Sequence, residues 1–178
     1  MPARHPLRDG AGRPMILRVW LGLAAIGAGL IHLALAIGSP ALVAAVVIVI
    51  GLAEFGWGVL AVAAERPPIA TAARIGAIVP VLLWALVLVV AGPAQLGPFT
   101  SAIRLLPMLI ASALDLVLVI GLTVAIRRPR PAAAGGAALR LVLILLGAVV
   151  VAALTLPALA ATEAGEQVRT GGFTGHQH

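Results

Sequence analysis

Five long apolar stretches dominate the sequence and limit what the chain can fold into. Short segments rich in Gly, Pro and Arg separate them, and they cover about residues 15–37, 41–64, 73–91, 103–126 and 138–160. A helix of roughly 20 mostly apolar residues is long enough to cross the hydrocarbon core of a bilayer. A helix also satisfies its own backbone hydrogen bonds in lipid. The pattern therefore predicts an all-α bundle of five transmembrane helices.

The composition agrees with this prediction. Hydrophobic residues make up 62% of the 178 residues and charged residues only 10%, whereas soluble domains have about 45–50% and about 25%. A domain of this size leaves much of its surface exposed to its surroundings. Soluble enzymes, nucleic-acid-binding modules and disordered chains are therefore nearly excluded. The chain has no Cys, which excludes disulfides and thiolate metal sites.

The distribution of Arg predicts the orientation of the bundle. All twelve basic residues are Arg, and ten of them lie before or at the start of the first stretch or around the second and fourth loops. Five spans put these three regions on one side, which the positive-inside rule assigns to the cytoplasm. We therefore expect a cytoplasmic basic segment (1–14), a transmembrane domain (15–160) and an external polar tail (161–178) in the cytoplasmic, or inner, membrane.

Two segments also resemble processing signals. Residues 1–36 have a basic start, an apolar core and a small-residue end at Ala34-Leu35-Ala36, but this core is long for a signal peptide. Cleavage after Ala160 would release the tail. Small residues are also common at the ends of transmembrane helices, and we favour an uncleaved chain.

Apart from Arg residues near the ends, three ionisable residues fall inside the apolar stretches: His32, Glu54 and Asp115. Each shares a helical face with small or weakly polar residues, because positions three, four or seven apart lie on one side of a helix. These neighbours are Ala25, Ala28, Gly29 and Ala36 for His32, Gly51, Gly58 and Ala61 for Glu54, and Met108, Ala111 and Ser112 for Asp115. Since small residues let helices approach closely, the three side chains are expected to point into the bundle.

Two interpretations of these residues remain open. A rise of about 1.5 Å per residue puts Glu54 roughly 20 Å and Asp115 roughly 18 Å from the outer ends of their stretches, and His32 only roughly 8 Å. The two carboxyl groups would then meet at one level and share a proton or hold a cation, with His32 on the access route. Alternatively, all three act only as interhelical hydrogen-bonding groups, with Ser112 and Met108 as neighbours.

The tail after Ala160 is polar and rich in Gly, and its lack of periodicity predicts no regular structure. It ends in His176 and His178, whose imidazoles suit Cu(II) or Ni(II). Two His residues form only a weak metal-binding pattern, so we favour a solvated tail and expect no other cofactor.

Two sequence elements, Gly29-Leu30-Ile31-His32-Leu33-Ala34 and Glu54-Phe55-Gly56-Trp57-Gly58, resemble small multi-pass membrane proteins of high-GC bacteria. Some of these proteins end in a His-containing tail after a stretch similar to residues 161–165. The resemblance covers most of the chain, but these bacterial proteins have no assigned activity to carry over.

Enzyme signatures such as a phosphate-binding loop, a nucleophile elbow or a His-Glu-x-x-His motif do not occur in the sequence. We therefore expect a non-enzymatic integral membrane protein, an accessory or complex-supporting subunit linked to metal handling at the external face. Its partners would be the lipid bilayer and either another membrane protein or further copies of itself, and not nucleic acid. The alternative is a small proton-coupled or cation transporter that uses the Glu54–Asp115 carboxyl pair.

Overall fold

The computed structural model describes residues 15–64, 70–95, 105–127 and 137–171. They form six helices, α1 (Met15–Leu35), α2 (Ala41–Ala63), α3 (Ala70–Gln95), α5 (Leu105–Arg127), α6 (Ala137–Ala160) and α7 (Glu163–Gly171). The described part of the chain contains no strand. The all-α prediction is confirmed for these residues.

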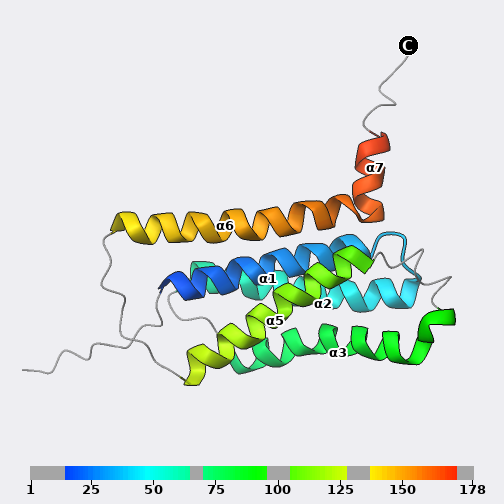
Figure 1. The fold of residues 1–178 in the computed structure, drawn as a ribbon, viewed down its shortest axis with the longest axis horizontal. Helices are drawn as coiled ribbons and strands as arrows, with labels where there is room; N and C mark the ends of the chain where they lie inside the picture. The colour runs from blue at the N-terminus through cyan, green and yellow to red at the C-terminus, as the bar shows by residue number, and fades with distance from the viewer. Residues whose placement is uncertain (1–14, 65–69, 96–104, 128–136, 172–178) are drawn as a thin grey trace, which may run out of the picture.

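Four helices, α1, α2, α5 and α6, are long and apolar enough to cross a membrane. Helix α3 covers the third predicted span, and within the described residues Thr71–Leu86 form an apolar helical segment. Along the chain, the helix direction alternates from α1 through α2, α3 and α5 to α6. The start of α1 and the end of α6 therefore lie at opposite ends of the bundle (Figure 1). These four helices indicate a membrane protein.

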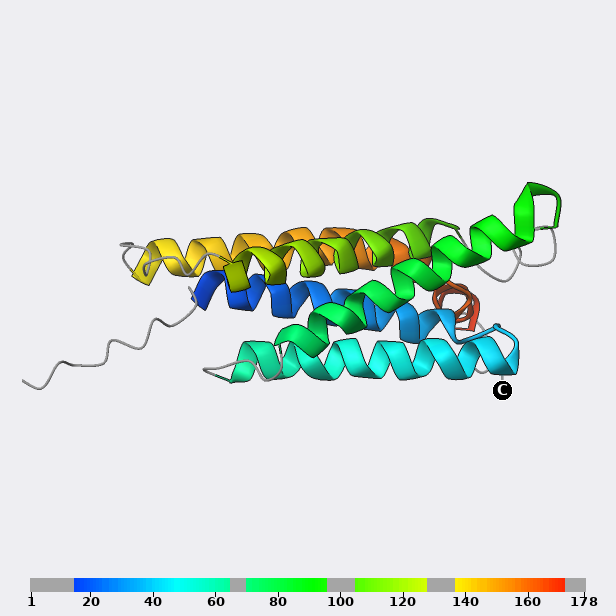
Figure 2. The same cartoon turned by 90° about the horizontal axis from the view of Figure 1, so that it is seen from below.

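Helix α1 is the central element of the bundle. It packs against α2, α5 and α6, whereas α3 packs mainly on α5 and only weakly on α2 (Figures 1 and 2). Accordingly, 56% of the most apolar 18-residue segment of α1 is buried, whereas the share is 17% for the corresponding segments of α2 and α6. Any polar group on the inner faces of α1, α2 and α5 thus lies away from lipid.

Glycines bring α1 and α2 into backbone contact. A Cβ atom added to Gly22 would lie 2.9 Å from the carbonyl oxygen of Gly58, and one added to Gly58 would lie 2.7 Å from that of Gly22. Seven residues later in α1 and seven residues earlier in α2, Gly29 and Gly51 repeat this reciprocal contact. Only Gly permits such close approach, so these four positions fix the register of the antiparallel pair.

Helix α6 is held against α1 by contacts at two levels. The indole Nε1–H of Trp20 donates a hydrogen bond to the carbonyl oxygen of Leu143 at 2.9 Å. The ring of Trp20 also lies against Gly147, where an added Cβ would clash with it. Further along, Gly27 of α1 makes room for the Thr155 side chain. These contacts complete the core around α1.

The prediction that the tail has no regular structure is wrong for Glu163–Gly171, which form α7. Thr162 caps this helix, because its hydroxyl accepts a hydrogen bond from the Gly165 N–H at 3.2 Å and donates one to the Leu159 carbonyl oxygen at 2.7 Å. Glu163 and Glu166 in the first turn and Arg169 in the last complement the helix dipole. This capping pattern was the signal that periodicity alone did not contain.

Candidate intramembrane cation site

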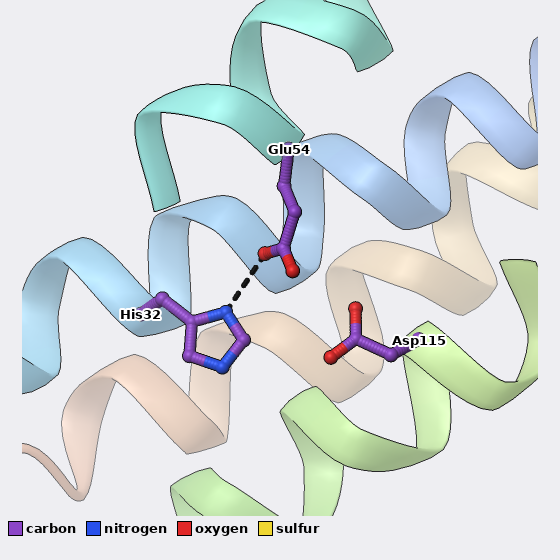
Figure 3. A group of neighbouring side chains, drawn as sticks. All are labelled: His32, Glu54 and Asp115. Carbon is purple, nitrogen blue, oxygen red and sulfur yellow. Dashed lines mark hydrogen bonds and ion pairs between the residues drawn. The ribbon is translucent and has the colours of Figure 1, made fainter. Parts of the chain in front are cut away.

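His32 and Glu54 form a buried hydrogen-bonded pair between α1 and α2. The imidazole Nδ1 lies 2.7 Å from the Glu54 Oε2 atom (Figure 3). Only 2% of His32 and 7% of Glu54 are exposed. When Nδ1 carries the proton, its N–H donates to the carboxylate, and this leaves the opposite ring nitrogen, Nε2, for another partner.

The predicted difference in depth between His32 and Glu54 applies to their backbones, whereas their side chains meet. The contacts of Gly22 with Gly58 and of Gly29 with Gly51 set the Glu54 backbone at the level of Ile26, which lies six residues, or about 9 Å, from His32 along α1. Side chains of a helix lean toward its N-terminus. Because α1 and α2 are antiparallel, the His32 and Glu54 side chains lean toward each other and meet.

Asp115 reaches the same point from α5. It is fully buried, and one ligand atom from each of His32, Glu54 and Asp115 lies within 4.8 Å of the others. Figure 3 shows the Asp115 carboxyl group directed toward the His32–Glu54 pair. The three residues that the sequence singled out are therefore brought together by three different helices.

Most carboxylate oxygens in this cluster have no hydrogen-bond partner within the described residues. Glu54 Oε1 and both oxygens of Asp115 are buried and unpartnered. Buried polar groups are normally satisfied, and an unsatisfied one costs about 1–3 kcal/mol. The arrangement therefore demands something further: a proton shared between the two carboxyl groups, or a bound positive charge.

The donor set suits several cations. Carboxylate oxygens bind protons, hard cations and ammonium groups, and an imidazole nitrogen adds affinity for transition metals such as Zn²⁺. Two carboxyl groups at this separation in a low dielectric cannot both be ionised at low cost without such a charge between them. The donor set of the cluster can therefore hold either a proton or a cation.

Of the two predicted supporting residues, Met108 is buried and Ser112 is half-buried. Met108 lines a cavity of about 70 Å³ next to His32. Trp84 of α3 lines the same cavity, and its indole Nε1 has no partner within the described residues. The sequence indicated only that Trp84 packs between helices, since no motif links it to His32.

His176 and His178, the predicted metal ligands of the tail, lie outside the described residues. The structure therefore does not test the Cu or Ni site. Comparison of the chain with protein-family models, curated proteins and solved structures finds no match in any of the three. The cluster itself thus carries the functional argument.

Proposed function

We propose that this protein is a five-span membrane protein that moves a cation across the bilayer in exchange for protons. His32, Glu54 and Asp115 form its binding site. The observation that carries the proposal is the convergence of these three buried residues with three unpartnered carboxylate oxygens. In the proposed orientation the N-terminus is cytoplasmic and α7 is external, as the Arg distribution favours.

A purely structural role for the cluster accounts for less of the geometry. Interhelical hydrogen bonds in membranes contribute about 0.6 kcal/mol on average, and each needs a donor. Here one imidazole N–H serves one of the four carboxylate oxygens. Since an ionisable group in a membrane interior is costly, three at one point favour a functional site.

The exchange follows from competition for the same oxygens. A cation that binds between Glu54 and Asp115 displaces the proton that they share, and a returning proton displaces the cation. His32 stabilises the ionised Glu54 through the Nδ1 hydrogen bond. This makes the runner-up interpretation of the sequence, a small transporter, the preferred one over an accessory subunit.

Reconstitution into liposomes tests the proposal. With an imposed pH gradient, addition of a panel of Na⁺, K⁺, Mg²⁺, Zn²⁺ and tetraphenylphosphonium should release protons for at least one cation. Glu54→Gln and Asp115→Asn should abolish that release. Glu166→Gln is the matched control, because it removes a carboxylate from α7, outside the cluster. This variant should retain the proton release. Absence of cation-dependent proton flux for the whole panel would reject the proposal and favour an accessory role.

A further inference from the structure

A second, larger cavity adjoins the site between α2 and α3. Its volume is about 480 Å³, and Glu54 forms part of its wall. Most of the remaining lining is apolar, from residues such as Ile50, Ala53 and Ala77, and Leu118 of α5 lies one turn beyond Asp115. The cavity exists because α3 packs on α5 and only weakly on α2.

The cavity opens sideways, toward the lipid. Val49, Leu60 and Val79 line it and are also exposed on the outer surface of α2 and α3. These positions lie within the apolar parts of both helices, where the bilayer would surround the bundle. A ligand that enters here comes from the hydrocarbon phase and must itself be lipophilic.

The lining is poorly suited to a small inorganic ion. A single water occupies about 30 Å³ of liquid, so a bare or partly hydrated ion would leave most of the cavity empty. Apolar walls offer no ligands to the ion's hydration shell. Cavities of about 300–1,000 Å³ with apolar walls and a few polar groups typically bind drug-sized molecules.

Two residues at the wall have groups that suit a positive charge. Glu54 borders the cavity and its carboxylate lies just behind the wall, buried in the cluster with His32 and Asp115, while Trp57, one turn further along α2, supplies an indole ring to the lining. A carboxylate and an aromatic face together favour organic cations, because the ring attracts a diffuse positive charge that water solvates weakly. Asp115 stands behind Glu54 in the cluster with both oxygens unpartnered.

We infer that the ligand is a lipophilic organic cation, whose charged centre lies at Glu54 and Asp115 and whose apolar body fills the cavity between α2 and α3. The inference rests on the proposed function and names its substrate class. Entry is lateral, from the bilayer, and binding displaces the proton held by the carboxyl pair.

Two glycines provide a matched pair of test variants. A Cβ atom added at Gly76 or at Gly56 meets no atom within 4 Å, so a larger side chain fits at either position without a clash. Gly76 lines the cavity, whereas Gly56 does not. Gly76→Phe should therefore occupy part of the cavity, and Gly56→Phe serves as the control for adding the same side chain to a helix.

Binding of tetraphenylphosphonium to the purified full chain in detergent, measured by equilibrium dialysis, tests the inference. The wild type and Gly56→Phe should bind it with proton release. Gly76→Phe and Glu54→Gln should each weaken binding by about tenfold or more, from loss of space and of the charge pair respectively. Neutral triphenylphosphine oxide should show no dependence on Glu54.

The outcomes separate the inference from the proposed function. Glu54-dependent exchange of protons for Zn²⁺ or another inorganic ion, with no tetraphenylphosphonium binding, would overturn the inference and leave the proposed function standing. Equal tetraphenylphosphonium binding by Gly76→Phe and Gly56→Phe would also overturn it, since the cation would then bind outside the cavity. Failure of every cation to bind would reject both.

Discussion

Gly29 of α1 and Gly51 of α2 lie backbone against backbone. A Cβ atom built on Gly29 would be 2.7 Å from the Gly51 carbonyl oxygen, and one built on Gly51 would be 2.8 Å from the Gly29 carbonyl oxygen. This contact lies within one turn of both His32 and Glu54. The register of the helix pair and the hydrogen bond at the site therefore depend on the same glycines.

Replacing Gly29 by Val should destabilise the protein. The new side chain would meet the α2 backbone, which cannot rotate away, and overpacking of this kind costs about 1–3 kcal/mol or more. The apparent Tm in detergent should fall clearly below that of Gly56→Val, where an added side chain has open space. Similar Tm values for the two variants would contradict the close helix contact.

The His32–Glu54 pair should be energetically coupled. Loss of His32 removes the one N–H that bonds Glu54 within the described residues, so once His32 is absent the removal of Glu54 costs less. A double-mutant cycle of His32→Ala and Glu54→Ala, measured by unfolding in detergent, should give a coupling of about 0.5–3 kcal/mol. A control cycle pairs His32→Ala with Thr123→Ala and should be additive, because the Thr123 hydroxyl donates its hydrogen bond to the Val119 carbonyl oxygen within α5. Additive behaviour of both cycles would argue against the hydrogen bond.

Asp115→Leu should stabilise the fold and abolish function. Leu branches at the same carbon as Asp, and it replaces two buried oxygens that have no partner within the described residues. Removal of such a penalty is worth about 1–3 kcal/mol. The apparent Tm should rise while cation-dependent proton release disappears. A loss of stability as large as that of Gly29→Val would indicate that Asp115 has a structural partner.

Helix α7 should depend on Thr162. Its hydroxyl caps the first turn, and loss of a capping side chain costs about 0.5–2 kcal/mol. Thr162→Ala should therefore speed hydrogen exchange of the amides of Glu163–Gly171, whereas Thr162→Ser should keep their protection. Unchanged exchange in Thr162→Ala would mean that α7 is held by other contacts.

Much of this architecture could be predicted from the sequence, because a helix that crosses lipid must have a certain length and an apolar composition. The predicted limits of the first, second, fourth and fifth stretches agree with α1, α2, α5 and α6 to within about two residues. The inward direction of His32, Glu54 and Asp115 was also predicted, since the small neighbours that share their faces are what permit close helix packing.

Other features require the three-dimensional arrangement. The meeting of His32 with Glu54 depends on the register of α1 against α2, which comes from the Gly22–Gly58 and Gly29–Gly51 contacts rather than from either helix alone. The cavity beside Glu54 depends on how loosely α3 packs on α2. No local pattern encodes the space between two helices that are distant in sequence.

The weak packing of α3 on α2 has a consequence for selectivity. One wall of the cavity belongs to the rigid glycine-packed pair, and the other belongs to a helix held mainly by α5. Because α3 packs only weakly on α2, we expect that an outward shift of that wall would leave the Gly29–Gly51 contact and the His32–Glu54 hydrogen bond in place. We therefore expect the cavity to select ligands by charge rather than by shape. It should bind bulky cations of many shapes and not their neutral analogues.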